Sequence, residues 1–417
     1  MEKFGEKRYF SEEPTGEKDE SFWDWKTGKK FLVDWEDDYL KKFEHCNDPQ
    51  VSPDGQTIAA KIKDEKGYSI AVNGQPWKER FKYCWVLVFS PDSQTIAAGI
   101  RDKDGWTIAV NGQPWKKRFE KCWDPVFSPD SQTIAAEIED KDGCSIAVNG
   151  QPWNERFEDC WTPVFSPDSQ IIAARIKDKD GCSIAVNGQP WKERFESCWD
   201  PVFSPDSQTI AAGIRDKDGW TIAVNGQPWK KRFEDCLIPV FSPDSQTIAA
   251  RIKDKGGWTI AVNGQPWKKR FEDCWNPVFS PDSQTIAAKI KDKDGWTIAV
   301  NGQPWKERFE DCWDPVFSPD SQTIAAGIRD KDGWTIAVNG QPWKKRFEDC
   351  WNPVFSPDSQ TIAAKIKDKD GWTIAVNGQP WKERFEDCWD PVFSPDGKKI
   401  MVVAEKEGKI YRIVKEI

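Results

Sequence analysis

The chain has 417 residues, a formal net charge of −9 and 31% charged residues of both signs. This balance is typical of a solvated surface and argues against nucleic-acid binding, which needs a basic face. No apolar run approaches the roughly 18 residues that span a membrane, and Met1 to Glu6 lack the apolar core of a secretory signal. We therefore expect a cytoplasmic, monomeric protein that binds neither nucleic acid nor membranes.

The N-terminal 48 residues precede the regular part of the chain. Residues 1–20 are polar and charged, and we expect a flexible arm there. Residues 21–48 are expected to form a hairpin over Ser21–Asp38, whose aromatic side chains flank Lys26-Thr27-Gly28, followed by a ring-closing strand over Tyr39–Cys46. Residues 49–417 form one array of repeats.

The array is built from a 38-residue unit. Its Ser-Pro-Asp sequence recurs ten times without insertion or deletion, at Pro53, Pro91, Pro129, Pro167, Pro205, Pro243, Pro281, Pro319, Pro357 and Pro395. A fixed period of this size indicates a propeller, a solenoid or an array of modules.

Each unit is predicted to contain four short strands and no helix. In the unit Asp124–Trp161 these are Pro125–Ser128, Thr133–Glu139, Cys144–Val148 and a fourth strand that holds Trp153 and Phe157. Pro129-Asp130-Ser131 and Asn149-Gly150 are typical turn sequences. Four strands with turns between them favour an all-β repeat.

Small side chains stand in the middle of the predicted strands. Ala135, Ala136 and Ala147 occupy positions where β-branched residues would be more common. Both faces of each sheet are therefore expected to be closely covered, as they are when the blades of a propeller stack on one another.

The repeat resembles a known family. PVFSPDSQTIAA, followed by KDKDG and a TIAVNG hairpin, is similar to the WD40-like β-propeller repeats of the TolB type, over about 365 of the 417 residues. The resemblance implies the propeller fold and is nearly silent on function. The glycine that usually follows Ser-Pro-Asp in that family is present only as Gly55 and Gly397, in the first and last copies.

The two ends of the array are complementary. Tyr39–Cys46 aligns with the end of a unit, whereas Pro391–Ile417 contains three predicted strands and no fourth. Pairing both ends in one blade would close the ring and remove exposed strand edges. We predict a single closed all-β propeller of ten four-stranded blades, in which the N-terminal strand completes the C-terminal blade. Nine blades with a capping segment is the alternative, and two five-bladed rings is a third possibility.

Ten of the twelve cysteines occupy one repeat position, and the other two, Cys144 and Cys182, stand where other units have Trp106 or Trp220. No zinc-binding spacing of cysteine and histidine is present. We interpret the repeated cysteine as a small buried apolar residue. The alternative, a ring of reactive thiols, would require exposed groups of low pKa.

Catalytic and metal-binding patterns are weak. His45 is the only histidine, and we interpret it as a surface residue. Asp102-Lys103-Asp104-Gly105 and its copies are predicted to be β-turns, because a calcium loop needs further acidic positions. We therefore expect no enzymatic activity, no metal site and no cofactor.

Tryptophan occurs at three positions of the unit. The sets that contain Trp77 and Trp106 are predicted to pack between blades. The third set follows the repeated cysteine and includes Trp123, Trp161 and Trp313. Core packing is the first interpretation of this set, because Leu237 replaces one member, and a platform that stacks on a sugar or peptide is the second.

One position varies while its surroundings do not. It follows the Ala-Ala pair and is occupied by Lys61, Gly99, Glu137, Arg175, Gly213, Arg251, Lys289, Gly327 and Lys365. A fourth-strand position, represented by Glu79 and Lys117, varies with it. Opposite charges could meet there, or duplication of unit pairs could have carried the pattern along. A third hypothesis is a ligand-facing ring made by Lys61, Glu137, Arg175, Arg251, Lys289 and Lys365.

The function favoured by the repeats is non-catalytic binding, with a protein or peptide as partner. Repeated near-equal sites would provide avidity without strong single contacts. The alternative is a lectin-like or small-molecule-binding ring that uses the tryptophans after the repeated cysteine, Trp123, Trp161 and Trp313 among them.

Overall fold

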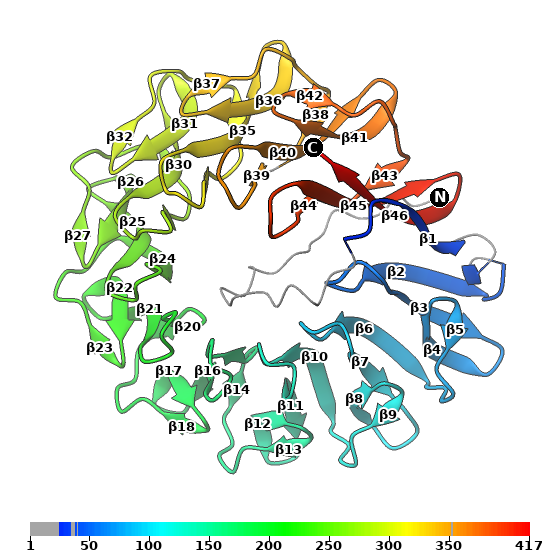
Figure 1. Cartoon of the computed structure of the whole chain (residues 1–417). Coiled ribbons are helices and arrows are strands. Elements are labelled where there is room, and N and C mark those ends of the chain that lie inside the picture. The colour runs from blue at the N-terminus through cyan, green and yellow to red at the C-terminus, as the bar shows by residue number, and fades with distance from the viewer. Residues whose placement is uncertain (1–24, 35–37, 40, 352) are drawn as a thin grey trace.

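A computed structural model describes residues 25–34, 38–39, 41–351 and 353–417. The described residues form ten antiparallel sheets arranged as the blades of one ring (Figure 1). The prediction of a single ten-bladed, all-β propeller is therefore confirmed, and the nine-bladed and double-ring alternatives are wrong. The expected arm at residues 1–20 lies outside the described residues.

The blades are numbered here in chain order. Blade 1 comprises β2 (His45–Val51), β3 (Ile58–Asp64), β4 (Gly67–Val72) and β5 (Gln75–Pro76), and blade 2 comprises β6 (Tyr83–Phe89), β7 (Ile96–Arg101), β8 (Trp106–Val110) and β9 (Gln113–Pro114). Blade 3 comprises β10 (Lys121–Phe127), β11 (Ile134–Asp140), β12 (Gly143–Val148) and β13 (Gln151–Pro152), and blade 4 comprises β14 (Asp159–Cys160), β15 (Val164–Phe165), β16 (Ile172–Asp178), β17 (Gly181–Val186) and β18 (Gln189–Pro190). Blade 5 comprises β19 (Ser197–Cys198), β20 (Val202–Phe203), β21 (Ile210–Asp216), β22 (Gly219–Val224) and β23 (Gln227–Pro228).

Blades 6 to 9 repeat the pattern. Blade 6 comprises β24 (Asp235–Phe241), β25 (Ile248–Asp254), β26 (Gly257–Val262) and β27 (Gln265–Pro266), and blade 7 comprises β28 (Asp273–Cys274), β29 (Val278–Phe279), β30 (Ile286–Asp292), β31 (Gly295–Val300) and β32 (Gln303–Pro304). Blade 8 comprises β33 (Asp311–Cys312), β34 (Val316–Phe317), β35 (Ile324–Asp330), β36 (Gly333–Val338) and β37 (Gln341–Pro342). Blade 9 comprises β38 (Asp349–Cys350), β39 (Val354–Phe355), β40 (Ile362–Asp368), β41 (Gly371–Val376) and β42 (Gln379–Pro380).

Blade 10 closes the ring. It contains β43 (Asp387–Cys388), β44 (Val392–Phe393), β45 (Lys399–Lys406), β46 (Lys409–Glu416) and β1 (Gly28–Asp34). Strand β1 pairs antiparallel with β46, from Gly28 opposite Val414 to Asp34 opposite Lys409. An N-terminal strand completes the C-terminal blade, as predicted, so the first and last described strands lie in one sheet (Figure 1).

The closing strand is not the segment that the alignment indicated. It is β1, whereas Tyr39 is fully buried against blade 1 and donates its hydroxyl hydrogen to the carbonyl of Ile58 (3.0 Å), and His45 begins β2. Tyr39 does occupy the repeat position that Trp77 holds in the next unit. In every complete unit, however, this tryptophan comes after the fourth strand and is not part of it. The hairpin expected over Ser21–Asp38 lies partly outside the described residues, and its described part contains this single strand.

The strands of one unit match the prediction except at the outer rim. Asn149 and Gly150 form the expected turn with φ of +46° and +82°. The fourth strand is only two residues long, because Pro152 has no N–H to continue the ladder. Phe157 then returns to the sheet in a single bridge to Cys144. First strands lie nearest the centre of the ring and the short fourth strands lie farthest out (Figure 1).

The hydrophobic core lies between blades. Around blade 7, for example, Ala249 and Ile260 of blade 6 pack with Phe271 and with Ile286 and Ile290 of blade 7. The mid-strand alanines are completely buried throughout the array. The expectation that small residues let both sheet faces be covered closely is confirmed.

The Ser-Pro-Asp turn links neighbouring blades through a serine that stands at the family's glycine position. Ser283 has a φ of +65°, a region that glycine occupies more easily. Its hydroxyl oxygen accepts a hydrogen bond from the backbone N–H of Asp244 in the preceding blade (2.9 Å). Equivalent bonds join blades 1 to 9 in sequence. Gly55 and Gly397, in blades 1 and 10, have no hydroxyl for this contact.

Candidate functional site

The variable position lies in the middle of the second strand, at the boundary with the next blade. In blade 7, Lys289 is only 6% exposed. Its Nζ lies 4.3 Å from the ring centroid of Trp296, 5.0 Å from that of Trp275 and 3.1 Å from Oδ1 of Asp311 in blade 8. The lysine therefore sits between two indole rings and is neutralised by the next blade.

Blade 9 has the same arrangement. The Nζ of Lys365 lies 4.3 Å from the ring centroid of Trp372, 4.9 Å from that of Trp351 and 3.0 Å from Asp387 of blade 10. Burial of each cation is balanced by a carboxylate and by the electron-rich faces of indole rings.

The other cations at this position also bind across or near a blade boundary. Arg251 lies 4.0 Å from the ring centroid of Trp258 and pairs with Asp273 at 2.8 Å. Arg175 lies 3.8 Å from the ring centroid of Trp161 and approaches Asp200 at 3.3 Å. Lys61 pairs with Asp48 at 3.1 Å and donates a hydrogen bond to the carbonyl oxygen of Trp85 (2.8 Å).

These pairings correct the hypothesis about charge. The aspartates lie on or just after the first strand of a blade, and the described residues show no ion pair between the variable position and the fourth-strand position that varies with it. Lys117 and Lys231, at that second position, instead pair with Asp140 and Asp254. The hypothesis that these two positions meet is therefore wrong, because the cations at the variable position pair with aspartates and not with the glutamates at the fourth-strand position.

Glycine at the variable position makes room for an indole ring. A Cβ atom on Gly327 would lie 2.4 Å from Cδ1 of Trp313, and one on Gly99 would lie 2.2 Å from the ring of Trp85. Trp313 stacks on Trp334 with centroids 5.3 Å apart and donates its Nε1–H to the carbonyl of Cys350 (2.8 Å). The space beside the second strand thus holds either a cation or a tryptophan.

Blade 3 is different because Glu137 occupies this position and no tryptophan stands at Cys144. Glu137 is 8% exposed, and no hydrogen bond or ion pair to it is found among the described residues. Burial, aided by repulsion from Asp159 and opposed by the charge of Arg175, raises the pKa of Glu137 to about 8. Glu137 is thus a buried carboxyl group without the partner that its equivalents have.

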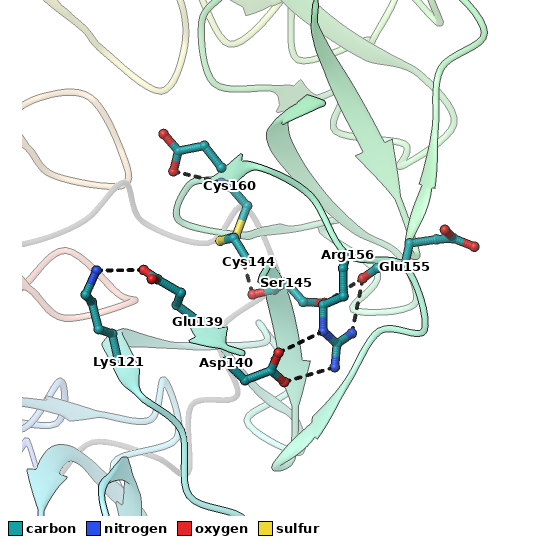
Figure 2. Close-up of a disulfide and its surroundings, with 9 residues drawn as sticks. Lys121, Glu139, Asp140, Cys144, Ser145, Glu155, Arg156 and Cys160 are labelled. Atoms are coloured by element: carbon teal, nitrogen blue, oxygen red, sulfur yellow. Dashed lines mark hydrogen bonds and ion pairs between the residues drawn. A yellow bond between two sulfur atoms is a disulfide. The ribbon is translucent and has the colours of Figure 1, made fainter. Parts of the chain in front are cut away.

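Two disulfides join neighbouring blades in this part of the ring. Cys144 of β12 bonds Cys160 of β14, with Cα atoms 5.8 Å apart (Figure 2). Cys182 of β17 bonds Cys198 of β19 in the same way, with Cα atoms 5.9 Å apart. Our interpretation of every repeated cysteine as an unbonded apolar residue is wrong for Cys160 and Cys198. A signal was present: only these two units carry a second cysteine, in place of tryptophan.

The remaining repeat-position cysteines agree with the predicted burial. All are buried except Cys46, which is half-buried. Burial raises the pKa of Cys274 and Cys312 to about 12. The alternative of a ring of reactive thiols therefore has no support, since the thiolate is strongly disfavoured.

The tryptophans after the repeated cysteine divide into two groups. Trp275, Trp313 and Trp351, on blades 7 to 9, are 44%, 40% and 45% exposed, whereas Trp123 and Trp161 are half-buried. Together with Ile238 of blade 6, the first three form what we call the apolar arc. The tryptophans of the arc lie in the loops that divide the first strands.

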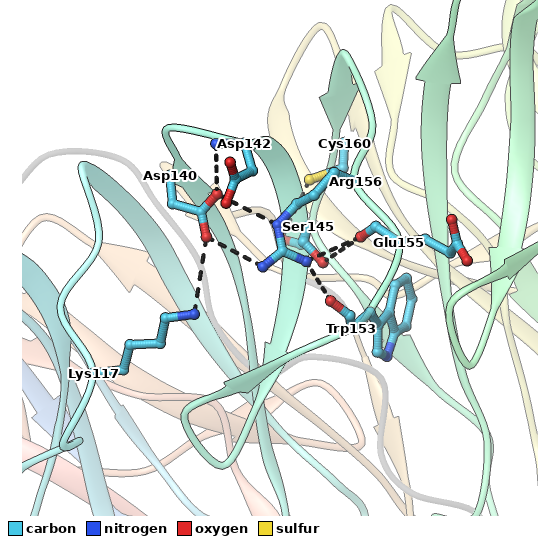
Figure 3. Close-up of polar contacts among 8 residues, drawn as sticks. All are labelled: Lys117, Asp140, Asp142, Ser145, Trp153, Glu155, Arg156 and Cys160. Carbon is cyan, nitrogen blue, oxygen red and sulfur yellow. Dashed lines mark hydrogen bonds and ion pairs between the residues drawn. The ribbon is translucent and has the colours of Figure 1, made fainter.

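The outer corner of each unit holds an arginine. In blade 3, Arg156 binds Asp140 and the carbonyl of Trp153, and Lys117 of blade 2 approaches Asp140 at 4.0 Å (Figure 3). Burial disfavours ionisation of Asp140, but the hydrogen bond and charge of Arg156 outweigh it, so the pKa of Asp140 is lowered. Asp142 N–H binds the same carboxylate (3.0 Å), which confirms the predicted turn.

Two shallow pockets lie beside such corners, three units apart. Their volumes are about 370 and 440 Å³, and each is lined by two arginines, a tryptophan and acidic side chains. The first contains Arg101, Trp106 and Arg118, and the second contains Arg215, Trp220 and Arg232. Arg118 and Arg232 are already paired with Asp102 and Asp216. The pockets therefore contain largely satisfied charges.

Comparison with known proteins finds matches among solved structures. No protein-family model and no curated protein sequence matches the chain. A solved structure described as the Dos1 propeller has 10% identity and a TM-score of 0.38, covering 79% of this chain and 91% of its own. A putative TolB from Agrobacterium tumefaciens has 14% identity and a TM-score of 0.29, covering 53% and 80%.

The Ser-Pro-Asp repeat and the ring of antiparallel sheets together define a β-propeller built from one repeated unit. Within that class, this chain is a ten-bladed ring of nearly identical units, closed by strand β1 and stapled by disulfides on both sides of blade 4. His45, the only histidine, lies exposed at the start of β2. A membrane-spanning helix is not found in the described part of the chain.

Proposed function

We propose that the ring is a non-catalytic platform that binds a protein or peptide segment along the apolar arc. The observation that carries the proposal is the exposure of Trp275, Trp313 and Trp351 on three consecutive blades. Aromatic side chains are enriched at protein interfaces, where their large apolar area is buried on binding. Equivalent sites on adjacent blades would add their contributions when one segment occupies them together.

The charges beside the arc favour a basic partner. Lys289 and Lys365 are buried, whereas the side chains of their partners Asp311 and Asp387 are 43% and 44% exposed. The surface therefore presents carboxylates next to indole rings, and the whole chain carries a net charge of −9. A segment with arginine or lysine next to apolar residues could pair with the carboxylates and pack its apolar side chains against the exposed parts of the indole rings.

The lectin-like alternative has weaker support. A sugar-stacking platform needs a free ring face, but Trp313 already stacks on Trp334 at 5.3 Å. Trp275 and Trp351 each have a lysine within 5.0 Å of the ring centroid.

Cytoplasmic location and a monomeric state remain part of the proposal. The two disulfides bear on the first point, because disulfides are more typical of oxidising compartments. Thiol trapping at the moment of cell lysis, followed by mass spectrometry of the Cys144 and Cys182 peptides, tests the compartment. Blocked thiols on both would support a reducing cytoplasm, and intact disulfides would contradict it.

Selection from a display library of random dodecapeptides tests the binding proposal. The wild-type chain is expected to enrich peptides rich in arginine, lysine and apolar residues, and the triple variant Trp275→Ala, Trp313→Ala, Trp351→Ala is expected to lose that enrichment. The matched control replaces the half-buried Trp123 and Trp161 at the same repeat position with alanine. Equal enrichment by the wild type and the arc variant would overturn the proposal.

A further inference from the structure

Blade 3 and blade 4 meet at a cluster of three metal-binding groups. The carboxylate of Glu137 and the sulfur atoms of Cys144 and Cys160 all lie within 4.8 Å of one another, and all three side chains are buried. They come from the second and third strands of blade 3 and from the first strand of blade 4. The cluster is thus assembled from two blades and is independent of the apolar arc.

The carboxyl group of this cluster has no hydrogen-bond or ion-pair partner among the described residues. Glu137 is more than nine-tenths buried and has no hydrogen bond or ion pair among the described residues. At the same position, Lys289 and Lys365 each pair with an aspartate of the next blade. A buried carboxylate is costly unless it is paired or coordinates a metal.

We propose that Glu137, Cys144 and Cys160 bind one divalent zinc-type cation when the Cys144–Cys160 disulfide is reduced. Two thiolates and one carboxylate are ligands that zinc prefers, and three protein ligands leave the fourth tetrahedral position for water. Ligand atoms around a tetrahedral zinc ion are about 3.6–3.8 Å apart, whereas bonded sulfur atoms are about 2.0 Å apart, so the two sulfur atoms separate by about 1.7 Å after reduction. The carboxylate oxygen already lies within 4.8 Å of both sulfur atoms. The cation would supply the partner that Glu137 lacks.

The exchange between the two states balances as a two-electron step. A dithiol or phosphine reductant supplies two electrons, the S–S bond breaks, and each sulfur takes up one proton. Metal binding then forms two metal–sulfur bonds and one metal–oxygen bond and releases to solvent both thiol protons and, where Glu137 is protonated, its carboxyl proton. Reoxidation by a small-molecule disulfide, which takes up two electrons and two protons to become two thiols, reforms the Cys144–Cys160 bond and expels the cation, because bonded sulfur atoms no longer act as thiolates.

The next blade boundary provides a matched control. Cys182 and Cys198 form the same cross-blade pair, but the position equivalent to Glu137 is Arg175. Arg175 donates a hydrogen bond to the carbonyl of Cys198 (3.0 Å) and brings a positive charge to the site. A cation is therefore expected at the first boundary and excluded from the second.

Titration of the full-length chain with Co²⁺ in metal-free buffer tests the proposal. After reduction with a phosphine, the wild type is expected to bind one Co²⁺ with a thiolate-to-cobalt charge-transfer band, which Zn²⁺ then removes. Cys144→Ser is expected to abolish the band, Glu137→Gln to weaken binding more than tenfold, and Cys182→Ser to leave the band unchanged. The oxidised wild type is expected to bind no Co²⁺ and to bind it after reduction. This comparison tests the proposal on the unaltered chain.

Three results would overturn the proposal. The first is the absence of a charge-transfer band in the reduced wild type. The second is a band that persists in Cys144→Ser or disappears in Cys182→Ser. The third is an unchanged affinity of Glu137→Gln for Co²⁺. Far-UV circular dichroism of each variant shows whether it is folded, so a lost band counts only for a folded chain. Failure here would leave the apolar arc untouched, because the arc is on blades 6 to 9.

Discussion

Replacement of Gly327 by alanine tests whether glycine at the variable position exists to admit an indole ring. The new Cβ would lie 2.4 Å from Cδ1 of Trp313, closer than packed atoms allow. Trp313 would have to leave its place. It would lose the hydrogen bond to the carbonyl of Cys350 (2.8 Å) and the stack on Trp334 (5.3 Å).

The magnitude follows from these contacts. The hydrogen bond contributes about 1 kcal/mol and the aromatic pair about 0.5–1.5 kcal/mol. Gly327 does not have a positive φ, so alanine is compatible with its backbone and returns about 0.4–1 kcal/mol through the unfolded chain. We expect Gly327→Ala to lower the free energy of unfolding by about 0.5–2 kcal/mol.

A double-mutant cycle with Trp313→Leu provides the control. Leucine already occupies this repeat position as Leu237 in blade 6, so the repeat tolerates it. Without the indole ring, Gly327→Ala is expected to be neutral or stabilising, which gives a coupling free energy of about 2 kcal/mol. Guanidinium chloride unfolding of all four chains, followed by far-UV circular dichroism, measures it. An equal cost of Gly327→Ala in both backgrounds would refute the reasoning.

Three further predictions concern single sites. Because burial raises the pKa of Glu137 from 4.5 to about 8, its neutral form favours the folded state fully below about pH 4.5, and this contribution disappears as the pH rises through 8. The disulfide-intact wild type should therefore lose stability relative to Glu137→Gln between pH 5 and 8.5, by at most about 4 kcal/mol, and parallel pH profiles from denaturation would contradict this. Ser283→Ala loses the bond from Asp244 and keeps the positive φ, so it should cost about 1 kcal/mol relative to the wild type. Ser283→Gly loses the same bond but relieves the strain, so it should cost less. A Ser283→Ala variant with the denaturation midpoint of the wild type would show that the hydroxyl bond does not matter. Cys274, fully buried with a pKa of about 12, should resist iodoacetamide in the native chain and react after unfolding, and rapid native alkylation detected by mass spectrometry would show that the blade boundary opens.

Much of the fold could be predicted because the signals are local and repeated. The Asn149-Gly150 turn, the three longer strands and the tight alanine packing follow from turn chemistry and side-chain alternation. The choice of Tyr39–Cys46 as closing strand was wrong. Alignment to the repeat places Tyr39 correctly, but it cannot show that the eight-residue strand β46 pairs with β1, which lies before Tyr39 in the chain.

The candidate site was predicted only in outline. Variation among Lys289, Gly327 and their equivalents did indicate a position with a special environment, but the pairing of Lys289 with Asp311 joins two blades. That contact depends on how blades stack, and nothing in the period of the repeat specifies it. The same applies to the disulfides, whose cysteines lie on different sheets.

The sequence by itself determined the class of fold, the number of units and the burial of their small residues, because each depends on spacing that every copy repeats. Only the tertiary structure decided which strand closes the ring, which carboxylate meets each buried cation, and which cysteines bond. Those outcomes depend on contacts between blades, where residues from separate units approach one another. The exposed Trp275 and the buried Glu137 acquire their chemistry from such neighbours.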